Sequence, residues 1–105
     1  MKRGEVVWYT FREPNKRRPV LILTRDTALS FLNAVTVAPI TSTIRNIPSE
    51  VYLDEDDGLL NPCVANFDNI VTVSKDKLGR RIATLSLDKM LDAEEALKFA
   101  LGFIR

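Results

Sequence analysis

A cluster of positive side chains just before an apolar segment is the clearest candidate for chemistry in this chain. Arg12, Lys16, Arg17 and Arg18 make up the cluster, and Arg18 directly precedes Pro19. Clustered arginine and lysine side chains are typical of proteins that bind a phosphate backbone. Because proline fixes the local backbone, the Arg18 guanidinium is expected to be a pre-organised, bidentate phosphate donor. An ordinary solvated loop tip explains the same charges, so both interpretations stay open.

The residue types that are missing limit the chemistry further. The sequence contains no histidine and a single cysteine, Cys63. These counts exclude an internal disulfide, a His and Cys metal centre, a Ser-His-Asp triad and acid-base catalysis by imidazole. We therefore expect a chemistry without a metal or another cofactor. Cys63 itself is expected to be a small buried apolar side chain.

The formal net charge of +1 results from cancellation between segments. Residues 1–48 carry eight cations and three anions, whereas residues 49–60 carry five anions and no cation. The first segment suits an anionic ligand, and the second would repel one. The overall balance therefore does not exclude a nucleic-acid partner.

Short strands must position these side chains. Segments rich in β-branched and aromatic residues predict six or seven strands. The segments are 6–11, 20–24, 34–40, 50–53, 63–67, 70–73 and 81–85. Pro39 indicates an edge strand or a strand end, and Gly58 indicates a turn. Arg80 and Arg81 could extend a basic groove or flank a turn, and we favour the turn. Trp8 and Tyr9, in the first segment, are expected in the core.

Two helices complete the predicted elements. Asp26 can cap a short helix over residues 27–32. Ser86 can cap a longer C-terminal helix in which Glu94 faces Lys98. Apolar residues recur there at spacings of three and four: Leu87, Met90, Leu91, Leu97, Leu101 and Ile104. The chain is thus predicted to be one domain, 1–105, that is mainly β with α: a strongly bent sheet or small barrel with a helix packed against it.

The sequence also predicts where the protein works. No apolar run approaches the ~18 residues that span a bilayer, and the first residues lack the pattern of a signal peptide. We therefore expect a reducing, cytoplasmic setting and no membrane partner.

Several short motifs, in order along the whole chain, resemble the MazF/PemK family of toxin endoribonucleases from bacterial toxin–antitoxin pairs. The motifs are RGEVVW at 3–8, Glu13 five residues before RPVL at 18–21, APITS at 38–42, DNIVTVSKDKL at 68–78 and LGF at 101–103. Two departures are visible. PNKR at 14–17 replaces a Gly-rich loop of the family, and Asn69 replaces a glutamine.

This resemblance implies a fold, partners and an activity. The implied fold is a small SH3-like, strongly bent antiparallel barrel with a C-terminal helix, as in the CcdB gyrase poisons. The implied partners are a second copy of the chain, in a homodimer, and a cognate antitoxin whose acidic, partly disordered tail covers the basic groove. The implied activity is sequence-specific, metal-independent cleavage of single-stranded RNA, mRNA foremost. The ribose 2′-OH displaces the 5′-oxygen and leaves a 2′,3′-cyclic phosphate.

By the same resemblance, Arg18 and Thr41 match the family's essential arginine and threonine. We assign Arg18 to the phosphorane oxygens and Thr41 to a hydrogen bond that positions the scissile phosphate. A guanidinium with a pKa above ~12 is a poor base at neutral pH, which makes Glu13 the nearest alternative base. Glu13 could equally pair with Arg12 or Arg17, and Thr41 could merely cap a backbone group at a strand end.

RNA contacts are expected from the basic loop and from two further positions of the family motifs. The expected contact residues are Arg12, Lys16, Arg17, Ser42 and Asn69. Phe11 and Phe67 are candidates to stack on splayed bases, although aromatic residues in strands more often belong to the core.

Other functions fit the same fold. A gyrase poison of the CcdB type, or an inactive RNA-binding relative, would bind without cleaving. The gyrase poisons rely on a tryptophan near the chain end, whereas the only tryptophan here is Trp8. A third interpretation is an adaptor that binds peptides at an exposed sheet edge.

Overall fold

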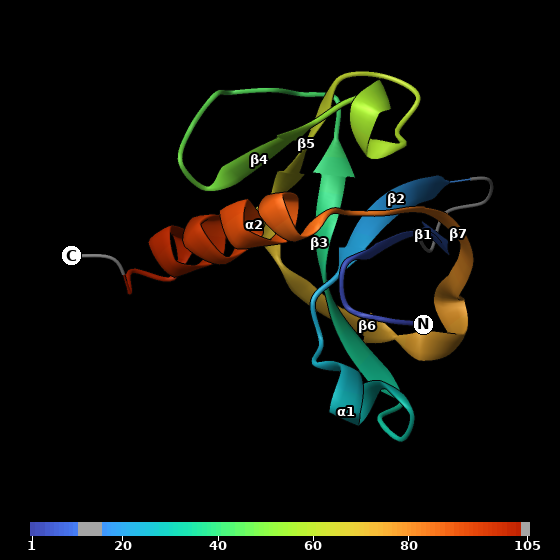
Figure 1. Ribbon diagram of the computed structural model, residues 1–105. Helices are drawn as coiled ribbons and strands as arrows, with labels where there is room; N and C mark the ends of the chain where they lie inside the picture. The colour runs from blue at the N-terminus through green and yellow to red at the C-terminus, as the bar shows by residue number, and fades with distance from the viewer. Residues whose placement is uncertain (11–15, 104–105) are drawn as a thin grey trace.

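A computed structural model describes residues 1–10 and 16–103 (Figure 1). Within these residues, seven antiparallel strands form a sheet in the order β4-β5-β3-β2-β1-β7, and β6 also pairs with β3. This architecture confirms the predicted fold class. The strands are β1 (Glu5–Thr10), β2 (Arg17–Ile22), β3 (Ala34–Thr41), β4 (Glu50–Leu53), β5 (Cys63–Asn66), β6 (Val71–Ser74) and β7 (Leu78–Thr84). The helices are α1 (Asp26–Leu29) and α2 (Leu87–Ala100), with short 3-10 turns η1 (Glu55–Asp57), η2 (Phe67–Asn69) and η3 (Lys75–Lys77).

Strand β3 runs through the centre of the molecule (Figure 1). Along one side it pairs with β2, and along the other it pairs first with β6 and then, from Ile40, with β5. Pro39 lies between the segment that pairs with β6 and the segment that pairs with β5. The prediction of an edge or a strand end at Pro39 was therefore wrong. A proline donates no ladder hydrogen bond, so it is accommodated where the strand changes partner.

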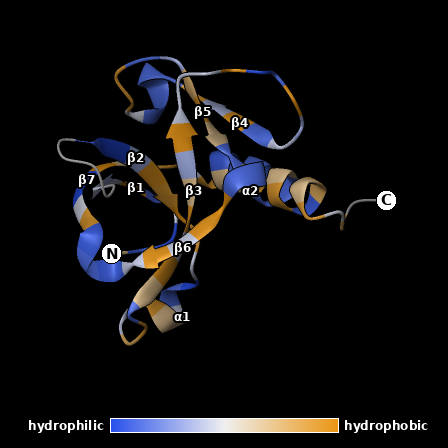
Figure 2. Cartoon of the chain, turned by 180° about the vertical axis from the view of Figure 1, so that it is seen from behind, coloured by the Kyte–Doolittle hydropathy of each residue, from blue (hydrophilic) through white to orange (hydrophobic). Residues whose placement is uncertain are grey.

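Alternate residues of the strands face two separate cores. Val6 and Leu21 belong to the first core, whereas Val7 and Val20 belong to the second. Phe67 lies in the first core with 1% of its surface exposed, so the expectation that it stacks on RNA bases was wrong. Figure 2 shows hydrophobic residues at the end of β3 and along β5, and a hydrophilic η1.

Helix α2 begins as the sequence predicts. The Ser86 hydroxyl accepts a hydrogen bond from the Lys89 backbone N–H at 3.2 Å, and Lys98 pairs with Glu94 at 2.9 Å. The buried face is centred on Ala93 and Ala96, not on the leucines. Much of the predicted apolar stripe is therefore exposed to solvent. Leu87, Leu91 and Leu101 are 75%, 52% and 53% exposed.

The structure also corrects two local predictions. Arg25 occupies the N-cap position of α1, and Asp26 is the first helical residue. The Asp26 carboxylate instead accepts a hydrogen bond from the Arg3 backbone N–H at 2.7 Å, so it ties α1 to the N-terminal turn. Arg80 and Arg81 lie inside β7 rather than in a turn, because β7 extends along β1 and pairs Arg81 with Val7.

No helix formed by residues 1–10 and 16–103 combines the length and the apolarity that crossing a membrane requires.

Candidate functional site

The candidate site lies where β2 begins and β3 ends. The register of these antiparallel strands pairs Val20 with Pro39. Continued by two residues, it places Arg18 opposite Thr41. Both residues line a cavity of about 270 Å³ at this end of the sheet, together with the segment that follows η1. Strand pairing therefore brings together two residues that are far apart in the sequence.

The polar side of this cavity carries two guanidinium groups, two hydroxyl groups and an amide. It is lined by Arg17, Arg18, Thr41, Ser42 and Asn61. Arg18 is exposed, and within the described part of the chain no carboxylate or hydrogen-bond acceptor pairs with its guanidinium. An unpaired guanidinium at a cavity wall is available to an anionic ligand.

Thr41 combines a structural contact with a free donor. Its Oγ1 accepts a hydrogen bond from the Thr43 backbone N–H at 3.2 Å. Thr41 therefore does cap a backbone group at the end of β3, as one of the two interpretations of this residue predicted. A hydroxyl has one proton besides its acceptor lone pairs, so the same Oγ1 can still donate to a ligand oxygen.

The other wall of the cavity is apolar and includes an aromatic ring that was expected in the core. Trp8 is half-buried, lines the cavity and belongs to neither core, so the prediction that it is a core residue was wrong. The Arg17 Cζ atom lies 4.7 Å from the centroid of the Trp8 ring, which is a cation–π contact. The remaining apolar surface comes from Pro19, Ile40, Leu59, Leu60, Pro62 and Ile82.

Cys63 lies at the cavity but is 7% exposed, which confirms the prediction of a small buried residue. Burial, and then the charges of Asp57 and Asp54, raise the pKa of its thiol above the ordinary value. A thiol with a raised pKa stays protonated at neutral pH and is a weak nucleophile. Cys63 therefore contributes packing rather than chemistry.

The acidic turn near the cavity is held by its own hydrogen bonds. Asp57 Oδ2 accepts from the Asp54 backbone N–H at 3.0 Å, and Asp54 Oδ1 accepts from the Asp56 backbone N–H at 2.9 Å. Lys89 lies 3.7 Å from Asp57. These carboxylates form a capping box for η1, so they are committed to the local fold.

The loop that leaves the site after Ser42 is fixed by one carboxylate. Glu50 Oε1 accepts hydrogen bonds from the backbone N–H groups of Arg45 and Asn46, at 2.9 and 3.0 Å. Asn46 has a φ of 60°, in the left-handed region. Both hydrogen bonds are exposed to solvent, and they tie this turn to the first residue of β4.

Not all of the predicted site residues meet at the cavity. Lys16 is exposed and lies directly before β2, outside the cavity lining. Asn69 is exposed in η2, at the opposite end of β5 from Cys63, so it is not part of the cavity either. The predictions for Phe11, Arg12 and Glu13 fall outside the described residues.

Sequence reasoning missed most of the residues that line the cavity, including Trp8, Leu60 and Asn61. Leu60 and Asn61 follow the Gly58 turn and belong to no predicted element. An apolar residue directly after an acidic turn was the available signal, but nothing in the sequence connects it to Arg18.

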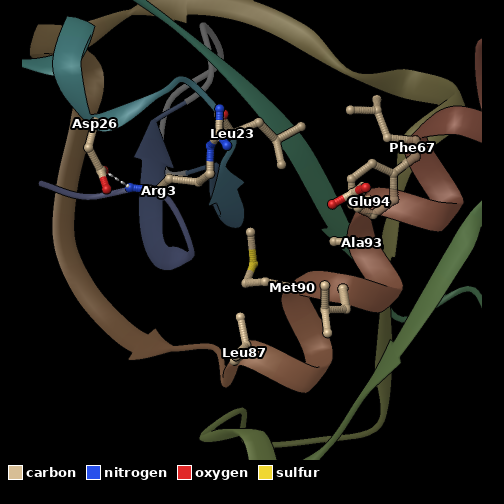
Figure 3. A pocket seen from close by; sticks show the side chains of 10 residues that line it. Arg3, Leu23, Asp26, Phe67, Leu87, Met90, Ala93 and Glu94 are labelled. Atoms are coloured by element: carbon tan, nitrogen blue, oxygen red, sulfur yellow. Dashed lines mark hydrogen bonds between the residues drawn. The ribbon is translucent and has the colours of Figure 1, made fainter.

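A second cavity, of about 360 Å³, lies between α2 and the N-terminal turn (Figure 3). Leu87, Met90 and Phe67 contribute apolar surface to it, and Arg3 and Asp26 lie at its edge. The Arg3 guanidinium already donates to the Leu23 carbonyl at 2.8 Å. Among residues 1–10 and 16–103, no three His, Cys, Asp or Glu side chains are grouped so that they could hold a metal ion. The cavity beside Arg18 is therefore the better candidate for anion chemistry.

Comparison with known proteins agrees with this geometry. Residues 2–101 match the family described as PemK-like, MazF-like toxin of type II toxin-antitoxin system. The chain belongs to this family. A relative from Mycobacterium tuberculosis, Endoribonuclease MazF3, is 44% identical over 88 residues, which are 84% of this chain and 82% of the relative. The resemblance seen in the sequence motifs is confirmed.

Solved structures of MazF-like toxins share the fold. Mycobacterium tuberculosis toxin MazF-mt6 matches with a TM-score of 0.86 and 38% identity, over 93% of this chain and 96% of that chain. An endoribonuclease from a mycobacterial species, solved in complex with its cognate antitoxin, matches with a TM-score of 0.88 and 30% identity. The match covers 100% of this chain and 98% of that chain. The predicted enzyme class agrees with the names of these relatives.

Proposed function

We propose that this chain is an endoribonuclease toxin that cleaves single-stranded RNA, with mRNA as its main target, in the cavity between β2 and β3. The observation that carries the proposal is the position of Arg18 opposite Thr41 at one cavity, with an unpaired guanidinium and a free hydroxyl donor. The relatives named endoribonucleases support the reaction class. Cleavage takes place in the cytoplasm, where transcripts are accessible.

The proposed reaction is an internal displacement. The ribose 2′-oxygen attacks phosphorus, the bond from phosphorus to the 5′-oxygen breaks, and the products are a 2′,3′-cyclic phosphate and a 5′-hydroxyl end. Negative charge on the non-bridging oxygens grows as the phosphorane forms. Arg18 donates two parallel N–H groups to these oxygens, which stabilises the transition state more than the ground state. Thr41 donates its hydroxyl proton to the phosphate and holds it in line for attack.

Two proton transfers complete the reaction. A base takes the proton of the 2′-OH, and an acid protonates the departing 5′-oxygen. A guanidinium is an extremely weak acid and therefore a poor general base. We assign the base to Glu13, the carboxylate nearest to Arg18 in the sequence. No step of the proposed reaction requires a metal ion.

Two protein partners belong to the proposal. The apolar face of α2 that the chain leaves exposed, with Leu87 and Leu91, is proposed as the contact of a homodimer. A cognate antitoxin is proposed to cover Arg17 and Arg18 with an acidic segment, because charge complementarity favours that contact. The mycobacterial relative solved with its antitoxin supports such a partner.

The test is cleavage of a long unstructured RNA by the purified chain in EDTA, followed by sequencing of the 5′-hydroxyl ends. We expect cuts at one short motif and cyclic phosphate at the upstream ends. A second substrate, with a 2′-deoxyribose at the mapped position, should stay intact at that linkage. An RNA that remains uncut in EDTA, or a deoxy substrate cut at the same rate, would contradict the proposed reaction.

A further inference from the structure

Part of the cavity beside Arg18 is not used by the phosphate chemistry. The apolar wall includes Leu60, which is 82% exposed, and Pro62. Such exposure contributes little to folding, so this leucine is better explained by a ligand than by the core. The cavity, of about 270 Å³, is smaller than the ~300–1,000 Å³ of sites for drug-sized ligands. It suits a group of the size of one nucleotide.

Arg17 and Trp8 form a stacking platform in this wall. The Arg17 Cζ atom lies over the Trp8 ring, 4.7 Å from its centroid, so the indole supports the guanidinium group. Within the described part of the chain, no carboxylate pairs with Arg17. A guanidinium plane that rests on an aromatic ring presents its other face to a ligand. Nucleobases in single-stranded RNA stack on such planes and on aromatic rings.

A hydrogen-bonding group lies at the same wall. Asn61 lines the cavity and is exposed, and the described residues offer its side-chain amide no hydrogen-bond partner. The amide supplies both an acceptor and donors, the combination that reads the edge of a base. Stacking by itself accepts every base, whereas an amide at the edge distinguishes among them.

Strand geometry separates this wall from the residues that act on the phosphate. Successive residues of a strand point to opposite faces, so Arg17 and Arg18 diverge at the beginning of β2. Trp8 and Arg17 lie on the same face of the sheet as Val6 and Leu21. Arg18 lies on the opposite face, the face of Val20. An RNA strand that passes the end of β2 can therefore place a phosphate at Arg18 and a neighbouring base at Arg17.

We propose that Arg17, supported by Trp8, together with Leu60 and Asn61 forms a subsite that holds one nucleobase beside the scissile phosphate and reads its identity. This inference rests on the proposed endoribonuclease function. Arg17, Leu60 and Asn61 contact the base, and Trp8 is a positioning residue that acts through Arg17. An acidic antitoxin segment is the competing occupant, but an unpaired amide and an exposed leucine match a base better than they match a carboxylate.

The experiment compares cleavage motifs from sequenced 5′-hydroxyl ends of one long unstructured RNA. The variants are Arg17→Lys, which keeps the charge but loses the planar group, Leu60→Ala and Asn61→Ala. Arg80→Lys and Asn33→Ala, at exposed positions outside the cavity, are the matched controls. We expect each subsite variant to lose about tenfold of its base preference at one and the same motif position, with the other positions unchanged.

The outcomes separate the two proposals. If the wild-type chain cuts the RNA and the three variants keep its base preference, the subsite is wrong and the endoribonuclease assignment stands. A uniform fall in rate at all sites would show that these residues contact only the backbone, and weakened antitoxin binding without a change of motif would assign the wall to that partner. Both results overturn the subsite. If the wild-type chain leaves the RNA uncut, the proposed function fails, and the subsite fails with it.

Discussion

Arg18 and Thr41 line the same cavity, each two residues beyond the last pair that joins β2 to β3. The register is fixed further inside the sheet, where Val20 lies opposite Pro39. Pro19 fixes the backbone directly after Arg18, so the guanidinium begins from a rigid strand rather than from a loop tip. This pre-organisation suits a group that must meet a phosphorane without first being ordered.

Thr41→Val should show how much the Thr41 hydroxyl contributes to cleavage. Valine keeps the shape but removes both the free donor and the acceptor of the Thr43 N–H. We expect a fall in cleavage rate of about 100-fold, as for the loss of one transition-state donor. Single-turnover kinetics on a short RNA measure it. Thr41→Ser keeps the hydroxyl and should stay within a few-fold of wild type, and equal losses in both variants would argue against the assignment.

Gly58→Ala should destabilise the turn that leads to Leu60. Gly58 has a φ of 92°, and an added Cβ would lie 2.9 Å from the Ala83 Cβ. The left-handed backbone and the overlap together should reduce the free energy of unfolding by about 2 kcal/mol or more. Urea unfolding measures the loss. Gly102→Ala is the control, because φ there is 81° but no atom lies within 4 Å, so a loss as large in both variants would exclude the overlap as a cause.

Glu50→Ala should loosen the loop after Ser42. The substitution removes the acceptor of the exposed Arg45 and Asn46 N–H groups, which water can replace, so the free energy of unfolding should fall by only about 0.5–1.5 kcal/mol. Glu50→Gln keeps an acceptor oxygen and should restore most of the loss. Hydrogen exchange at Arg45 and Asn46 reports the local effect. Unchanged exchange at both amides would mean that Glu50 does not hold the loop.

Leu91→Glu should break the proposed homodimer. Leu91 is 52% exposed on the face of α2 that the chain itself leaves uncovered. A buried charge at a subunit contact is strongly unfavourable, so sedimentation should give the mass of one chain, 11.9 kDa, instead of twice that value. Phe31→Glu removes a similarly exposed apolar group elsewhere and should stay dimeric. A dimer that survives Leu91→Glu would place the contact on another surface.

The sequence was sufficient for the elements whose signals are local. Enrichment in β-branched and aromatic residues identified the strands, and Ser86 with the Glu94 and Lys98 pair identified α2. Asp26 shows where local reasoning fails. It carries the side chain of a helix cap, but tertiary packing offers it the Arg3 N–H, which lies 23 positions away in sequence. No local sequence pattern indicates that the Asp26 carboxylate will bind a distant backbone N–H instead of capping its own helix.

The candidate site was only partly predictable, because it too depends on contacts between residues far apart in the sequence. The family motifs singled out Arg18 and Thr41, whereas their position at one cavity follows from the register of β2 and β3, which a single sequence does not specify. Trp8 was assigned to the core because aromatic residues in strands are usually buried. It lies instead at the end of the sheet, where Arg17 covers its ring. Asn61 carried no signal at all, since an exposed loop asparagine is ordinary until a cavity forms beside it.

The central claim, that Arg18 stabilises the phosphorane, is tested most directly by single-turnover cleavage of one defined RNA by wild type, Arg18→Lys and Arg18→Ala in EDTA. We expect Arg18→Ala to be slower by about 100- to 1,000-fold and Arg18→Lys to recover only part of the rate, because an ammonium lacks the planar fork. Since Arg18 is exposed and has no partner among the described residues, the free energy of unfolding should change by less than ~0.5 kcal/mol. Cleavage by Arg18→Ala at the wild-type rate, in a folded protein, would contradict the account.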